Sequence, residues 1–252
     1  MQFASLGSGS RGNATLVRSG DDCVLIDCGF TVKETQRRLA RLGVAAEQLA
    51  AVLVTHEHSD HLSGVAPLAR RYRLPVYMTP GTYKARDLGE LPALELIHGY
   101  QSFSVGSLDV TPVAVPHDAR EPAQFVVQAA GKRLGVLTDL GSITPHVENH
   151  YADCDALVLE ANHDPGMLAA GPYPVSLKRR VGGPWGHLSN LQTAGFLARL
   201  ERRRLQHLVV AHISQKNNSL ALAQAALTDK ISGIARVHYA CQDQGFDWLS
   251  IE

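Results

Sequence analysis

Neither sign of charge is in excess in this sequence of 252 residues, because 24 Lys and Arg residues balance 24 Asp and Glu residues. A chain without net positive charge lacks the overall basic field that holds nucleic acid irrespective of its sequence. Any contact with nucleic acid must therefore come from a local patch, together with shape and metal chemistry.

Long hydrophobic runs are also absent. No stretch of about 18 apolar residues could cross a bilayer. The first residues lack the charged segment followed by an apolar segment that marks a secretory signal peptide. These absences predict a cytoplasmic location and no membrane partner.

Cysteine is scarce, with four residues in the chain and no Cys-x-x-Cys spacing. This excludes a disulfide-stapled secreted scaffold and the usual cysteine-rich zinc modules, and we expect reduced thiols. Hydrophobic residues make up 45% of the chain, enough for a sizeable core. The length fits a single domain over residues 1–252.

Short apolar strands and amphipathic helices alternate along the chain without a strict βαβ rhythm. The clearest strands are expected at residues 1–6, 14–18, 23–28, 51–55, 75–78, 108–115, 124–129, 132–138, 156–160 and 207–213. The clearest helices are expected at residues 31–42, 62–72, 190–200 and 220–227. This order predicts an α/β protein with two sheets flanked by helices.

Twelve histidines are many for a chain of this length, and their placement is more informative than their number. The segment Thr55-His56-Glu57-His58-Ser59-Asp60-His61 directly follows a predicted apolar strand. Its potential ligands are too many for one tetrahedral ion, whereas a strand-to-helix turn can direct alternate side chains to two ions. The alternative is a solvated turn whose histidines cap the following helix.

Three further residues each follow a predicted strand: His117, Asp139 and His212. Strand ends meet at one edge of a sheet, so these side chains are expected to converge with the histidine segment. Taken singly, a core histidine or a helix-capping aspartate would explain each of them.

The ordered set resembles the metallo-β-lactamase superfamily over nearly the whole chain. The resemblance implies a four-layer αββα sandwich with two metal ions at one sheet edge. Carried over, the ligands of the first ion are His56, His58 and His117, those of the second are Asp60, His61 and His212, and Asp139 bridges them. Asp27, in Leu-Ile-Asp-Cys-Gly, matches the buried aspartate that positions the ligand loop, although a simple turn aspartate is the alternative.

Two divalent metal ions are therefore the expected cofactors. Ligands without thiolate suit zinc, and manganese or iron would also accept a His/Asp set. Such a pair of ions supplies a bridging hydroxide as the nucleophile at neutral pH. Asp60 is expected to take part in catalysis as well as in metal binding.

Two later segments favour phosphodiester substrates. Glu160-Ala-Asn-His-Asp and Gly186-His187-Leu-Ser-Asn resemble the glutamate and histidine loops of the nucleases that process the 3′ end of tRNA. That resemblance implies His187 as the general acid and Glu160 as its partner, as an in-line displacement requires. A structural hydrogen bond and a simple helix cap are the alternatives.

The lengths of chain between the candidate ligands reduce the number of nuclease subfamilies that the sequence can resemble. The chain between Asp139 and His212 is too short for the inserted domain of the larger nucleases, and that between His117 and Asp139 is too short for a tRNA-binding arm. The opening Ser8-Gly-Ser-Arg-Gly-Asn13 and the two later motifs resemble the compact YycJ/WalJ subgroup. This resemblance implies 5′-to-3′ exonuclease activity on DNA.

Several residues near these motifs are candidate substrate contacts. The glycine-rich loop lacks the helix that a dinucleotide site needs after its glycines. Structural turns, caps and solvated charge are the alternatives throughout. The candidates are Ser10, Asn13, Lys178, Arg179, Ser189, Asn190 and Asn217.

Two other functions remain open from the sequence. The same metal site could hydrolyse a small cyclic phosphodiester, a thioester or a lactone, which the neutral overall charge permits. A metal-bearing fold could also serve as a non-catalytic binding module, although the complete ligand set opposes this. The sequence does not determine the oligomeric state.

Overall fold

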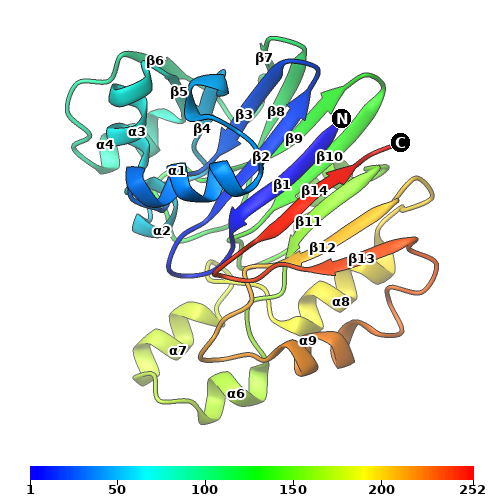
Figure 1. Ribbon diagram of the computed structural model, residues 1–252. Coiled ribbons are helices and arrows are strands. Elements are labelled where there is room, and N and C mark those ends of the chain that lie inside the picture. Colours follow the sequence, from blue (N-terminus) through cyan, green and yellow to red (C-terminus); the bar gives the residue numbers. More distant parts are fainter.

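The computed structural model describes residues 1–252 and contains two seven-stranded sheets that pack face to face (Figure 1). In spatial order, the strands of the first sheet are β14 (Phe246–Ser250), β1 (Gln2–Gly7), β2 (Ala14–Ser19), β3 (Asp22–Ile26), β4 (Ala51–Leu53), β5 (Pro75–Met78) and β6 (Ala93–Leu96). Strands β14, β1, β2 and β3 pair antiparallel, and β3 to β6 pair parallel.

The second sheet repeats this mixed arrangement. In spatial order its strands are β13 (Arg236–Tyr239), β12 (His207–Ala211), β11 (Ala156–Glu160), β10 (Lys132–Leu137), β9 (Ala123–Ala129), β8 (Leu108–Ala114) and β7 (Phe103–Val105). Strands β10 to β13 pair parallel, and β7 to β10 pair antiparallel.

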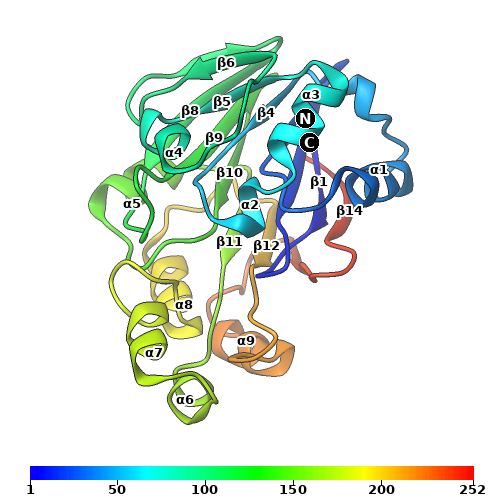
Figure 2. The ribbon, with the colours of Figure 1, turned by 90° about the vertical axis from the view of Figure 1, so that its left-hand side faces the viewer.

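The helices of the chain are α1 (Val32–Arg41), α2 (Ser59–Leu62), α3 (Val65–Tyr72), α4 (Pro80–Ala85), α5 (Pro145–Tyr151), α6 (Pro165–Ala170), α7 (Val175–Val181), α8 (Asn190–Arg199) and α9 (Leu220–Leu227), with a 3₁₀ turn at Ala46–Gln48. Most of them cover the outer faces of the two sheets, whereas α6 and α7 do not (Figures 1 and 2). None of these helices is long and apolar enough to cross a membrane.

Three layers of buried apolar side chains hold this arrangement together. In β3, Leu25 packs toward α1 and α3, while its neighbours Val24 and Ile26 pack between the two sheets, as the two-residue period of a strand requires. A third layer, including Phe196 of α8 and Leu227 of α9, packs on the outer face of the second sheet. The expected αββα sandwich is confirmed.

Local signals explain where most elements begin. Thr31 caps α1 by accepting a hydrogen bond from the Glu34 N–H, as expected. The helix expected over residues 62–72 begins later, at Val65, because a short separate helix, α2, ends at Leu62 and a turn at Ser63 and Gly64 divides the two. A Cβ at Gly64 would meet the Phe30 carbonyl oxygen at 1.9 Å, so the backbone there lies directly against the neighbouring loop.

The strand ends position the candidate site. Strands β3 and β4 of the first sheet run parallel, as do β10, β11 and β12 of the second. Their carboxyl ends therefore meet at one edge, the usual place for a site in such sheets. The strand expected over residues 207–213 ends at Ala211, because His212 has a left-handed backbone with φ 52°.

Helices α6 and α7 project from the rest of the molecule beside this edge (Figures 1 and 2). They were not expected from the sequence, although Asp164 and Pro165 form a capped helix start. No residue of α7 is buried. We call residues 165–181 the projecting arm.

Candidate metal centre

The loop after β4 places two histidines against a third from the opposite sheet. His58 Nδ1 lies 3.0 Å from His56 Nε2 and 3.2 Å from His117 Nε2. The three nitrogen atoms lie within 4.8 Å of one another. Nitrogen donors that converge in this way form a site suited to a divalent ion. The structure thus brings together the residues expected to bind the first ion.

The tautomers of two ligand histidines follow from the oxygens behind them. His117 Nδ1 lies 3.0 Å from the Gly186 carbonyl oxygen, and His212 Nδ1 lies 2.9 Å from Glu160 Oε1. A carbonyl or an ionised carboxylate only accepts, so each Nδ1 carries the hydrogen and each Nε2 offers its lone pair. Such outer partners orient metal-binding histidines.

Asp27 fixes the tautomers of two further histidines, that of His61 directly and that of His56 through Thr55. Its carboxylate accepts from the Thr55 N–H, the Thr55 hydroxyl and His61 Nδ1, each at 2.8 Å. Because the Thr55 hydroxyl donates to Asp27, it accepts from His56 Nδ1 at 2.9 Å. Both rings therefore present Nε2 toward the site. The structure places Asp27 behind the ligand loop, as the sequence predicts.

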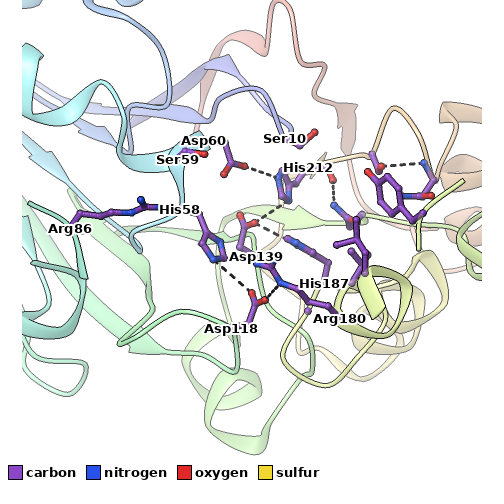
Figure 3. A pocket seen from close by; sticks show the side chains of 17 residues that line it. Ser10, His58, Ser59, Asp60, Arg86, Asp118, Asp139, Arg180, His187 and His212 are labelled. Atoms are coloured by element: carbon purple, nitrogen blue, oxygen red, sulfur yellow. Dashed lines mark hydrogen bonds and ion pairs between the residues drawn. The ribbon is translucent and has the colours of Figure 1, made fainter. Parts of the chain in front are cut away.

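A second group of converging donors consists of Asp60, His61 and His212, again within 4.8 Å. Asp139 also forms a group with His56 and His61, so it lies between the two clusters. Its Oδ2 lies 3.2 Å from His61 Nε2. Figure 3 shows Asp139 surrounded by His58, His187 and His212. This is the position expected of a bridging carboxylate.

The residues present fit metal ions. Asp139 Oδ2 and His212 Nε2 are buried atoms without a hydrogen-bond partner. Leaving such an atom unsatisfied costs about 1–3 kcal/mol, which a bound cation would remove. Asp27, Asp139 and His212 also have positive φ angles of 62°, 55° and 52°, an uncommon conformation that clusters at functional sites.

The charges of the cluster also favour a cation. Burial raises the pKa of Asp139, but His212 and His61 outweigh it and hold that pKa well below its usual value. Burial lowers the pKa of His61, but Asp139, Asp27 and Asp60 raise it well above its usual value. The ionised carboxylates therefore stabilise positive charge among the rings, where metal ions would supply it.

The glycine-rich loop supports the ligand loop from below. Asn13 accepts from the Gly9 N–H at 2.8 Å, its amide donates to Asp60 Oδ2 at 3.3 Å, and its Nδ2 lies 3.0 Å from His61 Nε2. A Cβ at Gly29 would meet the Asp60 carbonyl oxygen at 1.9 Å, so only glycine permits this close approach. Asn13, expected to contact substrate, is thus occupied in positioning Asp60 and His61.

The structure brings together the expected acid and its partner. His187 Nδ1 lies 2.8 Å from Glu160 Oε1, the oxygen that also holds His212. Glu160 Oε2 accepts from the N–H groups of Leu140 and Leu188, at 3.2 Å and 3.1 Å. Each carboxylate oxygen of Glu160 thus has two hydrogen-bond partners, and these hold the fully buried side chain in one position.

The charge state of this pair follows from the same contacts. Burial raises the pKa of Glu160, but His187 and His212 outweigh it and lower it to about 2. Burial lowers the pKa of His187, but Glu160 outweighs it and the net pKa is raised. With Nδ1 bound to Glu160, His187 directs Nε2 away from the glutamate, and its side chain is 20% exposed in the cavity.

A cavity of about 420 Å³ opens over the cluster, and it separates the expected substrate contacts into two groups. Ser10 and Asn217 line it. Lys178 and Arg179 instead lie along a separate groove on the other side of α7, and the Lys178 ammonium donates to the Ala169 carbonyl oxygen at 2.6 Å. The cationic residue of this run that faces the cavity is Arg180.

Ser189 and Asn190 also lie outside the cavity lining. Ser189 caps α8 by accepting from the Gln192 N–H. The Asn190 and Asn218 amides bond to each other at 2.8 Å and 2.9 Å. The structure therefore gives both residues structural partners in place of substrate.

Among the residues that line the cavity, Arg86, Asp118 and Tyr173 were missed by sequence reasoning. Asp118 could have been noticed, because it directly follows His117, and it pairs with Arg180 of the projecting arm. Figure 3 shows Arg86 on one side of the cluster and Arg180 on the other. No local motif marks Arg86 or Tyr173, which only the fold brings here.

Comparison with known proteins identifies the family of this chain. Residues 23–213 match the family described as the beta-lactamase superfamily domain. The chain is 33% identical to the exodeoxyribonuclease YycJ of Bacillus anthracis, over 90% of this chain and 88% of the relative. It is 30% identical to the exodeoxyribonuclease WalJ of Streptococcus pneumoniae, over 92% of this chain and 88% of the relative.

A solved structure supports the same fold. The zinc-bound PqqB protein of Methylobacterium extorquens superimposes with a TM-score of 0.75 and 20% identity, covering 99% of this chain and 100% of that one. At this identity the likeness concerns the arrangement of helices and strands alone. It agrees with the two sheets and flanking helices described above.

Proposed function

The chain belongs to the metallo-β-lactamase superfamily, and from that premise we propose that it is a metal-dependent 5′-to-3′ exonuclease acting on DNA as one domain over residues 1–252. The Glu160–His187 pair beside the ligand cluster carries this proposal, because it offers an acid at the place where a leaving oxygen needs a proton. The similarity to two exodeoxyribonucleases supports DNA as the substrate.

The proposed site holds two divalent ions, with zinc preferred over manganese and iron for this donor set. His56, His58 and His117 would bind one ion, Asp60, His61 and His212 the other, and Asp139 both. When bound, the ions supply positive charge to the phosphate and lower the pKa of water.

The residues of the chain then divide the work of an in-line displacement. A water molecule adds its oxygen to phosphorus while the bond from phosphorus to the leaving oxygen breaks. His187 Nε2 gives its proton to that leaving oxygen, and the proton that the water releases restores His187. Glu160 holds His187 in place through Nδ1, and Asp60 borders the path of the incoming water.

Purified protein loaded with zinc or manganese should degrade DNA labelled at one end. His187→Ala should lower kcat by roughly 10²–10⁴-fold, the usual contribution of a general acid, while metal content measured by mass spectrometry stays unchanged. His98→Ala, at an exposed histidine outside the cavity, is the matched control. Unchanged kcat in His187→Ala would remove the acid assignment.

Direction is tested on the same protein with two labels. If digestion starts at the 5′ end, a 5′ label is released at once as a small product, and a 3′ label persists on shortening strands. The opposite pattern, or products from the middle of a circular single strand, would contradict a 5′-to-3′ exonuclease.

A second candidate follows from the size of the cavity. Its volume of about 420 Å³ lies within the range of small-molecule sites, roughly 300–1,000 Å³. A small cyclic phosphodiester could therefore be the substrate. Comparison of kcat/KM for a cyclic dinucleotide and for a DNA strand distinguishes the two functions.

A further inference from the structure

The two ends of the cavity differ in chemistry. One end carries His58, Asp60 and Arg86 from the loops of the first sheet. The other end carries Asn162, Tyr173, Ser214 and Asn217, from the loops after β11 and β12 and from the projecting arm. We call these last four residues the amide end. None of them is needed for metal binding or proton transfer.

Asn217 is a buried amide without partners. It is 1% exposed, its Oδ1 is buried with no hydrogen bond, and its side chain donates to no other group. Its neighbour Asn218 bonds with Asn190 and with backbone carbonyl oxygens. A buried amide left unsatisfied costs about 1–3 kcal/mol. The Asn217 Nδ2 has no acceptor either, and a polar ligand in the cavity that Asn217 lines would supply one.

Asn162 has half of its amide free. Its Nδ2 donates to the His212 carbonyl oxygen at 3.1 Å, and its backbone N–H donates to the Leu188 carbonyl oxygen at 2.9 Å. No donor reaches its side-chain oxygen. Asn162 therefore lies between the loop of His187 and that of His212, with one acceptor available to the cavity it lines.

Tyr173 adds an aromatic surface to this end. It lies between α6 and α7, and the Lys216 ammonium lies 5.8 Å from the centre of its ring. Aromatic rings beside cations are the usual platform for bases of a single strand, since every base has a face that stacks. Lys216 also places a positive charge beside this ring, which suits a phosphate on the sugar of a stacked nucleoside.

The loops of the amide end form one unit with the acid. The Ser214 N–H donates to the Asn162 carbonyl oxygen, and the Asp164 N–H donates to the Asn217 carbonyl oxygen, both at 2.9 Å. His187 is bound to Glu160 at the end of β11, two residues before Asn162. The oxygen that receives the proton must lie beside His187, and Asn162 is bound to Leu188, the next residue along, so the amide end adjoins the position of the leaving group.

We propose that the amide end is a subsite for a single nucleoside on the leaving-group side of the broken bond. Asn162 and Asn217 bond the polar edges of that nucleoside, and Tyr173 stacks on its base. The bond between phosphorus and the 3′ oxygen of this nucleoside breaks, the oxygen takes the proton of His187, and water completes the new phosphate end. The new phosphate stays on the 5′ end of the remaining strand, and the released nucleoside is a 5′-mononucleotide when the strand began with a 5′ phosphate. This inference rests on the proposed nuclease function.

The test compares two substrates, only one of which has a nucleoside as its leaving group. One is a single-stranded DNA oligonucleotide, and the other is the p-nitrophenyl ester of thymidine 5′-phosphate, whose leaving group carries no nucleoside. Asn217→Leu, of similar volume, should lower kcat/KM for DNA by roughly 10- to 100-fold, the value of a bond to a buried amide. Its kcat/KM for the ester should stay within about twofold.

Gln215→Ala, at an exposed position of the same loop, is the control and should match the wild type on both substrates. Chromatography of the wild-type digest should show mononucleotides from the first time point. If Asn217→Leu does not fold, Tyr173→Ala decides, because it lies at the surface and should raise KM for DNA by a similar factor.

Two failures are distinguishable. Wild-type protein that cleaves the ester but no DNA would refute the proposed function. Wild-type protein that degrades DNA, with Asn217→Leu and Tyr173→Ala equally active, or with dinucleotides as the first products, would refute the subsite and leave the nuclease function intact.

Discussion

The two walls of the cavity are built in opposite ways. On the histidine wall, His56, His61, His117 and His212 are buried, and each has an oxygen behind its Nδ1 that fixes the ring. On the projecting arm, α7 buries no residue at all. The first wall is rigid enough to set distances between donors, whereas the second can change its side chains without cost to the core. Chemistry and substrate choice are therefore separable in this protein.

The largest effect should come from replacing Asp139, which lies between the two clusters of candidate ligands on the histidine wall. Asp139→Ala should lower bound metal and reduce activity by roughly 10³-fold or more, because metal ions supply several kcal/mol to such reactions. Metal content and kcat/KM measure the effect. Asp153→Ala is the control, since Asp153 has a similar φ of 56° but lies at an exposed turn. Normal activity in Asp139→Ala would show that this aspartate does not hold the metals.

The next effect should come from behind the histidine wall. Asp27→Ala removes three hydrogen bonds at once and leaves His61 without its buried partner. Breaking such a buried network costs about 3–5 kcal/mol, and loss of an outer partner lowers metal affinity by roughly 10- to 100-fold. Urea unfolding and metal titration measure the two effects. If both stay unchanged, the wall does not depend on Asp27.

Changes in the projecting arm should act on the substrate alone. Arg180→Gln should raise KM for DNA by roughly tenfold, since a bond to a charged group is worth about 1.5–3 kcal/mol. Its free energy of unfolding should change by less than about 0.5 kcal/mol, as for other surface positions. Arg179→Gln, on the same helix but outside the cavity, is the control. If Arg180→Gln lowered the free energy of unfolding as much as Asp27→Ala, the two walls would not differ in their contribution to stability.

The smallest effect is expected at the buried cysteines, whose thiols should not react in the folded protein. Burial raises the pKa of Cys28, beside the histidine wall, to about 11, and that of Cys154 to about 11. Near pH 8 both are therefore protonated and shielded, whereas Cys241 is exposed. A thiol reagent should label Cys241 rapidly and reach Cys28 only after unfolding. Rapid labelling of Cys28 would show that the histidine wall opens in solution.

The same contrast explains what the sequence could predict. His56, His58 and His61 occur in one short segment after a strand, and the other expected ligands follow strands of strong apolar character. Sequence order then places them at one sheet edge. The substrate contacts were harder to predict. Lys178 and Arg180 are both cations of α7, and only the face of the helix on which each lies decides that Arg180 reaches the cavity and Lys178 does not. Asn13 and Asn190 were expected at the substrate, but hydrogen bonds visible only in the folded chain occupy them.

The missed elements have a physical cause too. Helices α4, α5 and α6 each begin with a capping residue followed by proline, a signal that predicts a start but not a length. The helices are short and carry little apolar periodicity. The helix expected over residues 62–72 begins at Val65 instead, since a continuous apolar pattern does not reveal the turn at Gly64, whose backbone lies against Phe30.

The pairing of β1 with β14 has a consequence for synthesis on the ribosome. Strand β1 is made long before β14, so one of its edges stays uncovered until β14 has been made. Until then β1 presents an unpaired edge, the usual route to aggregation of a nascent chain. His212 also follows most of the strands of the two sheets, so the set of candidate ligands is complete only after those strands have been made. The interval between the synthesis of β1 and that of β14 should thus be the one in which the growing chain aggregates most readily.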